Sequence, residues 1–159
     1  MLRKQTAEAT QAAIAAGITQ IELEFPPVRD KLDISLGETS EANCGFAREL
    51  ARTFSARFGR ELWLVFPDQG EAARAQKRYG KTTFTVTSIE GAMNEGKDFE
   101  CKMQIVVNPG MTELTLSPFA FGRFSINEWI NLDKIYRPGV PMVLLNGGLD
   151  KVIFLCFYF

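Results

Sequence analysis

The sequence predicts an α/β fold: an open, mostly parallel sheet with helices on both faces, forming a three-layer, Rossmann-like αβα sandwich. Two observations carry this prediction. Apolar runs at residues 62–66, 103–107 and 141–145, the first of them unbroken, are typical of strands buried on both faces. Helical or turn-forming segments separate these runs, as parallel crossovers require. The 159 residues, 1–159, are expected to form a single domain.

The clearest βαβ unit runs from residue 61 to 88. Residues 62–66 (LWLVF) predict a strand, and the proline that follows lacks the N–H that a sheet ladder needs. Asp68 is then placed to cap a helix, with Glu71 at capping-box distance, and a glycine ends that helix. The β-branched run 82–87 predicts the next strand. The connection is long enough to cross over, so we expect parallel strands and a right-handed crossover.

The N-terminal third predicts a helix and an edge strand. Residues 6–16 form an Ala-rich helix closed by a glycine, and residues 18–25 form a strand. Glu22 and Glu24 alternate with apolar residues, which is typical of the solvent-facing side of an edge strand rather than of a catalytic carboxylate pair. Residues 30–37 fit either a short strand or an ordered loop.

The longest helix is expected at residues 38–58. Its apolar residues recur every fourth position and predict the buried stripe Ala42, Phe46, Leu50, Phe54 and Phe58. A set of arginines, Arg48, Arg52 and Arg57, with Arg60 beyond the helix end, suits a solvated helix face. The alternative is a docking surface for an acidic partner or an anionic lipid surface.

The rest of the chain is less regular. Residues 91–98 predict a polar loop, and residues 111–125 have no clear period. Residues 126–136 predict a helix that stops at a Pro-Gly break. The apolar tail 152–159 is too short to span a bilayer, which takes roughly 20 residues.

Composition excludes several function classes. A net charge of −1 gives no reason to expect nucleic acid as a partner. The share of hydrophobic residues, 46%, is enough to form a buried core. The absence of histidine excludes Ser-His-Asp triads and histidine metal ligands. Three widely spaced cysteines fit a reducing compartment rather than a disulfide framework or a metal pair. The start of the sequence lacks an apolar signal-peptide core, and we expect no transit peptide in this chain.

Residues 91–97 (GAMNEGK) match the GxxxxGK pattern of a phosphate-binding loop. The next residue is Asp98, where a magnesium-binding Ser or Thr is required, and a strand-like run follows instead of a helix. The pattern therefore favours a turn. We expect no cofactor and assign no catalytic residue.

Polar residues follow three of the predicted strands. Asp68, Asn108 and Asn146 would lie at one edge of a parallel sheet, outside the carboxyl ends, where open α/β sheets bind ligands. Nearby glycines would allow a ligand to approach the backbone: Gly70, Gly110, Gly147 and Gly148. The competing interpretation is that Asp caps a helix while Asn and Gly form turns.

Two stretches of the sequence carry a family resemblance: PDQGEAARAQ at 67–76 and RPGVPMVLLN at 137–146. With further similar segments, including MQIVVNPG at 103–110, the resemblance covers most of residues 5–150. The sequence resembles the plastid and cyanobacterial domain-of-unknown-function family that includes the plant low-photosystem-II-accumulation proteins. A related domain is fused to a chloroplast adenylate kinase.

The resemblance implies residence in the chloroplast, in the stroma or on the stromal face of the thylakoid. It implies a non-enzymatic accessory role in photosystem II assembly, with photosystem II subunits or other assembly factors as partners. It transfers no catalytic residues. The alternatives are a nucleotide- or phosphometabolite-binding domain that uses the carboxyl ends of the strands, and a degenerate domain retained for packing or dimerisation.

Residues 111–125 and 151–159 depart from the family pattern. Translation of unspliced intron would explain both segments, and the chain would then be truncated at its C-terminal end. Such a chain would expose a sheet edge and an apolar tail and would be prone to aggregate. Sequencing the transcript tests this hypothesis, and a spliced message that encodes both segments would refute it.

Overall fold

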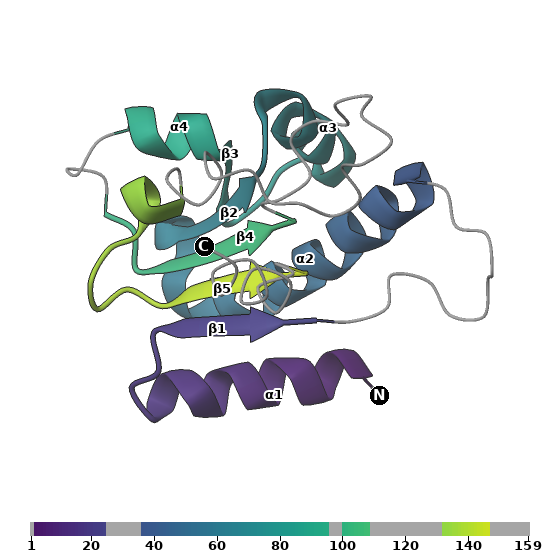
Figure 1. Ribbon diagram of the computed structural model, residues 1–159. Coiled ribbons are helices and arrows are strands. Elements are labelled where there is room, and N and C mark those ends of the chain that lie inside the picture. The colour runs from purple at the N-terminus through teal and green to yellow at the C-terminus, as the bar shows by residue number, and fades with distance from the viewer. Residues whose placement is uncertain (1, 25–35, 96–99, 109–131, 147–159) are drawn as a thin grey trace, which may run out of the picture.

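The computed structural model describes residues 2–24, 36–95, 100–108 and 132–146. Five strands form one sheet in the order β1-β5-β4-β2-β3, and every neighbouring pair is parallel. The predicted parallel α/β fold is confirmed, and Figure 1 shows β1, β5 and β4 pointing the same way. The strands are β1 (Gln20–Leu23), β2 (Leu62–Phe66), β3 (Thr85–Ser88), β4 (Met103–Val107) and β5 (Met142–Leu145).

Helices cover both faces of this sheet. The α2 face is covered by α1 (Leu2–Ala15), α2 (Leu36–Phe58) and α3 (Gln69–Tyr79). The opposite face, which we call the α4 face, is covered by α4 (Ile89–Asn94) and a helical turn at 132–135. In Figure 1, α2 runs behind the sheet while α4 lies on the other side. A short 3-10 turn, Gly59–Glu61, connects α2 to β2.

The interior strand β2, between β4 and β3, shows why its apolar run is unbroken. Leu62, Leu64 and Phe66 pack into the core under α2, whereas Trp63 and Val65 pack into the core under α4. All five side chains are at most 1% exposed. Successive side chains of a strand point to opposite faces, so a strand buried on both faces needs an apolar residue at every position.

The long helix α2 buries most of its predicted stripe. Phe46, Leu50 and Phe54 are each 6% exposed or less. The helix begins at Leu36, two residues earlier than predicted. Residues 30–35, for which the sequence left a strand or a loop open, lie outside the described residues, as do 111–125, 126–131 and the tail 152–159.

The prediction of a polar loop from residue 91 onward is wrong for its first residues, and the strand predicted at 82–87 is found at Thr85–Ser88. Residues 91–94, predicted as the start of a polar loop, belong to α4. Ser88 caps this helix by accepting a 2.9 Å hydrogen bond from the Gly91 amide, and Ile89 and Ala92 are buried against the sheet. The polar composition of 91–98 concealed this short amphipathic helix, which begins three residues before Gly91 on a serine cap.

At the end of the sheet, side chains cover the outer edge of β3. Gln76 on α3 donates a 2.8 Å hydrogen bond to the Val86 carbonyl, and Arg60 donates one of 3.4 Å to the Phe84 carbonyl. These two carbonyls are two residues apart, so both point away from β2. The chain itself therefore occupies the carbonyl of Val86 in the edge strand β3 and that of Phe84 just before it.

Candidate functional site

The strand connections reverse direction between β2 and β4. β2 leads through α3 on the α2 face to β3, whereas β4 connects to β5 on its other side, with the turn at 132–135 on the α4 face. In open parallel sheets, such a reversal opens a crevice outside the carboxyl ends of the two strands, and ligands bind there. Residues that follow β2 and β4 are therefore the first place to look for a site.

A small cavity occupies this position. Its volume is about 50 Å³, and it is lined by Ser40, Cys44, Phe66, Pro67, Glu71, Val107 and Asn108. Pockets that enclose small-molecule ligands usually measure roughly 300–1,000 Å³. The cavity between the described residues therefore has room for a few water molecules and is too small for a nucleotide.

Asp68 follows β2 and caps α3. Its Oδ1 accepts a 2.8 Å hydrogen bond from the Glu71 amide, which confirms the predicted cap. The Glu71 carboxylate turns instead to the Ser40 hydroxyl, at 3.3 Å, and to Arg74. A Cβ at Gly70 would lie 3.1 Å from Asp68 Oδ1, so this glycine leaves room for the cap rather than for a ligand.

Asn108 and Asn146 end two neighbouring strands in the left-handed conformation, with φ angles of 42° and 50°. Asn tolerates this conformation better than most residues other than glycine, and such angles concentrate at turns and functional sites. The backbone N–H of Asn108 donates a 2.9 Å hydrogen bond to the Leu145 carbonyl, and the backbone N–H of Asn146 donates one of 2.8 Å to the Leu23 carbonyl. The sheet ladder therefore extends through both residues. Gly110 and Gly147 lie outside the described residues.

Asn43, which sequence reasoning missed, joins this edge to α2. Its Oδ1 accepts a 3.0 Å hydrogen bond from the side-chain amide of Asn146. Asn43 is 2% exposed in a helix whose neighbouring buried residues are mainly apolar. A polar residue beside a predicted apolar stripe was the only signal available in the sequence.

Cys44, which lines the cavity, is hydrogen-bonded to the C-terminal end of α3. The Tyr79 hydroxyl donates a 2.6 Å hydrogen bond to the Cys44 carbonyl, and Arg48 donates to the Tyr79 carbonyl at 3.0 Å. Burial raises the pKa of the Cys44 thiol, and the negative charge of Glu71 raises it further. Cys44 therefore remains a neutral thiol, which is a poor nucleophile.

A second hollow of about 260 Å³ lies between α2 and α3 and shares Ser40 and Cys44 with the first. Two arginines of α3 line it, each held by a carboxylate. Arg78 pairs with Glu41 at 2.8 Å, and Arg74 pairs with Glu71. We call this hollow the α2–α3 cleft; its lining is Ser40, Glu41, Cys44, Arg74, Ala75 and Arg78.

The three arginines predicted as a docking set differ in their surroundings. Arg48 is half-buried and places its guanidinium 5.2 Å from the centre of the Tyr79 ring. Arg52 is exposed and lies 4.0 Å from Glu49, whereas Arg57 covers the ring of Phe58. Only Arg48 contacts α3.

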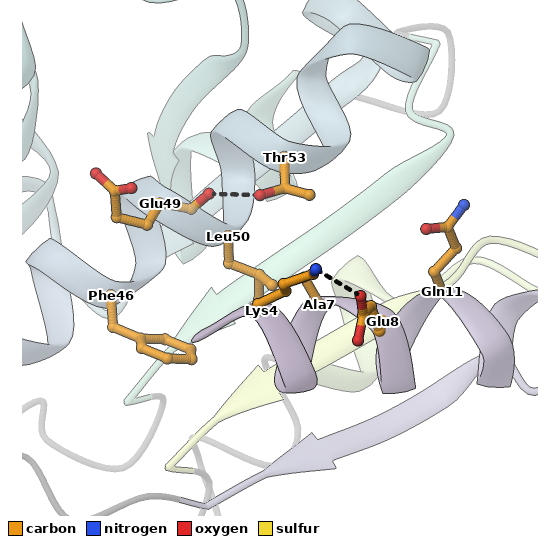
Figure 2. Close-up of a pocket in the computed structure, with 8 residues that line it drawn as sticks. All are labelled: Lys4, Ala7, Glu8, Gln11, Phe46, Glu49, Leu50 and Thr53. Carbon is orange, nitrogen blue, oxygen red and sulfur yellow. Dashed lines mark hydrogen bonds and ion pairs between the residues drawn. The ribbon is translucent and has the colours of Figure 1, made fainter. Parts of the chain in front are cut away.

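Two further hollows lie away from the carboxyl edge. A groove of about 350 Å³ runs between α1 and α2, with Ala7, Phe46 and Leu50 inside and an ion pair of Lys4 and Glu8 at its rim (Figure 2). The other hollow, about 450 Å³, lies over β1 and β5 beside the turn at 132–135. The groove between α1 and α2 has both positive and negative side chains at its rim, so its charge favours neither an anionic nor a cationic ligand.

Within the described ranges, no three His, Cys, Asp or Glu side chains come together as a metal site. Gly91, the first glycine of the GxxxxGK pattern, lies inside α4 rather than in a phosphate-binding loop. None of the helices in the described part of the chain is long and apolar enough to cross a bilayer.

Fold and site together define a doubly wound parallel α/β domain in which Asp68 at the carboxyl edge caps a helix and Asn146 bonds to α2. The chain belongs to the family described as Domain of unknown function (DUF1995), which matches residues 2–155. This match confirms the domain-of-unknown-function family that the sequence resembles. A comparison with curated proteins found no match.

Proposed function

We propose that this protein is a non-enzymatic plastid accessory factor that assists photosystem II assembly by binding other proteins. It would act in the stroma or at the stromal face of the thylakoid, on photosystem II subunits or other assembly factors. The resemblance of PDQGEAARAQ (67–76) and RPGVPMVLLN (137–146) to the low-photosystem-II-accumulation proteins supports this role. Membership of the domain-of-unknown-function family is compatible with it.

The observation that carries the proposal is that polar side chains at the carboxyl edge form hydrogen bonds within the fold. Asp68 caps α3, Ser88 caps α4, and Asn146 binds Asn43. These side chains hold helices and strands together at the place where an enzyme of this topology would hold its substrate. With a crevice of only about 50 Å³, the described surface favours contacts with another protein over enclosure of a small molecule.

Co-precipitation tests this proposal. The endogenous protein is precipitated with a specific antibody from gently solubilised chloroplasts, and the bound proteins are identified by mass spectrometry. We expect photosystem II core subunits or assembly factors to be enriched over a precipitation from plants that lack the protein. A pellet that contains only the protein itself would contradict the proposal.

A second candidate function is the binding of a nucleotide or a phosphorylated metabolite at the same edge. The left-handed backbone at Asn108 and Asn146, beside the reversal between β2 and β4, favours it. A thermal-shift screen of nucleotides and phosphometabolites separates the two functions. A ligand present at about 100 times its Kd stabilises by about 2.7 kcal/mol, which is several degrees in Tm for a domain of this size. No shift with any compound would count against this candidate.

A further inference from the structure

We propose that an acidic peptide segment of a partner protein docks on the exposed basic face of α3 and in the adjoining α2–α3 cleft. This inference rests on the proposed function, because it gives the chemistry of the partner for a protein that acts by binding proteins. The α3 basic face consists of Arg74, Lys77, Arg78 and Lys81, all of them exposed.

Charge is concentrated on this face. Residues 69–81 carry four cationic side chains and one carboxylate, Glu71, which gives a local net charge of +3 in a chain whose net charge is −1. Lys77 and Arg78 lie three and four residues after Arg74, so these three cations share one side of the helix, and Lys81 follows just after its end. The opposite side, with Ala72, Ala75 and Tyr79, is buried against the core.

The four cations differ in what they already bind. Lys77 and Lys81 take part in no ion pair with any described residue. Arg74 and Arg78 hold Glu71 and Glu41, and the side chains of Arg78 and Glu41 are 48% and 64% exposed. Exposed ion pairs contribute little to stability, so a carboxylate from a partner can replace the internal one.

The spacing of the cations suits a peptide better than a single small anion. From Arg74 to Arg78 the helix rises about 6 Å, and Lys81 follows two residues after the end of α3 at Tyr79. In an extended peptide, alternate side chains lie about 7 Å apart on one side, so two carboxylates can contact different cations along the face. The α2–α3 cleft, about 260 Å³ and open beside Arg74 and Arg78, has room for one such side chain.

Charge reversal of the unpaired lysines is the first test. The probe is a fluorescein-labelled peptide of ten glutamates, with ten glutamines as the neutral control, and binding is followed by fluorescence anisotropy at low salt. We expect the double variant Lys77→Glu/Lys81→Glu to bind the acidic peptide at least about tenfold more weakly. The matched control Lys4→Glu/Lys134→Glu has the same change in net charge at exposed positions of α1 and of the turn at 132–135 and should change the Kd by less than about twofold. Equal losses in both variants would overturn the inference.

Removal of an internal competitor is the second test. Glu41→Gln frees Arg78, so the acidic peptide should bind about two- to fivefold more tightly. Glu8→Gln is the matched control, because it also removes an exposed carboxylate from an ion pair, that with Lys4, and it should leave the affinity unchanged. Equal tightening in both variants would show a general charge effect and would contradict docking on α3.

Other occupants give different outcomes. Displacement of the peptide by millimolar inorganic phosphate would point to a small-anion site and overturn the inference. So would sedimentation of the protein with vesicles of anionic phospholipid when the peptide does not bind. If photosystem II proteins co-precipitate while the acidic peptide fails to bind, this inference fails and the proposed function stands.

Discussion

The side-chain amide of Asn146 donates a hydrogen bond of 3.0 Å to Oδ1 of Asn43, 103 positions earlier in the chain. This bond joins the end of β5 to the first half of α2 and so fixes the long helix over the carboxyl edge of the sheet. Asn43 is 2% exposed, so water has little access to its amide.

Substitution Asn43→Ala removes the acceptor and should lower the free energy of unfolding by about 1–3 kcal/mol, since a buried polar contact is lost. Urea unfolding followed by the fluorescence of buried Trp63 measures the change. Gln11→Ala on the exposed surface of α1 is the control and should stay within about 0.5 kcal/mol. Equal effects at the two positions would show that the Asn43–Asn146 bond contributes nothing.

The left-handed backbone at Asn108 predicts an order of stability between two variants. Both Asn108→Gly and Asn108→Ala remove the side chain, but only glycine adopts a φ of 42° without steric cost. The Gly variant should be more stable than the Ala variant by about 1–2 kcal/mol. Denaturation midpoints give the comparison, and an Ala variant as stable as the Gly variant would contradict it.

Gly91 and Gly45 should respond in opposite directions to alanine. A Cβ at Gly91 would overlap the Thr87 hydroxyl, whereas a Cβ at Gly45 meets nothing within 4 Å. Gly91→Ala should therefore destabilise by about 1–3 kcal/mol, and Gly45→Ala, inside α2, should stabilise by about 0.5–1 kcal/mol. Thr87→Ala in the Gly91→Ala background should recover part of the loss, and additive effects would refute the overlap.

Stability should fall at alkaline pH. Burial raises the pKa of the Cys44 and Cys101 thiols above their ordinary value of 9.0. The unfolded chain therefore releases these protons at a lower pH than the folded chain. The stabilisation is complete below the ordinary thiol pKa and is lost as pH rises above it.

Urea unfolding at pH 7.5, 8.5 and 9.5 should show this decline, and Cys44→Ala should make it shallower. Tyr79, whose pKa burial also raises, adds to the loss at still higher pH. Stability that stays constant over this range, or that rises, would contradict the thiol linkage.

The sheet was predictable because its interior strands β2, β4 and β5 are buried on both faces and are mainly apolar. All five residues of β2 and of β4 are buried, so a short, mainly apolar segment of sequence is enough to identify each strand. The N-terminal cap of α3 was also predictable from local sequence, because the two residues that form it, Asp68 and Glu71, lie three positions apart. Helix α4 was missed because six residues with a polar continuation give little periodicity.

The candidate site was predictable only in part. Parallel strands place Asp68, Asn108 and Asn146 at one edge, as expected from strand order alone. The bond between Asn43 and Asn146 and the pairing of Arg78 with Glu41 join α2 to distant parts of the chain. Such contacts depend on how helices pack on the sheet, which no local pattern specifies.

The occupied edge of β3 limits how copies of this protein can associate. Gln76 and Arg60 already donate to the carbonyls of Val86 and Phe84, so a strand from another molecule does not find these two acceptors free. At the other end of the described sheet, β1 pairs only with β5. An incoming strand at β3 would compete with Gln76 and Arg60 for these two carbonyls, which disfavours association of copies through this edge.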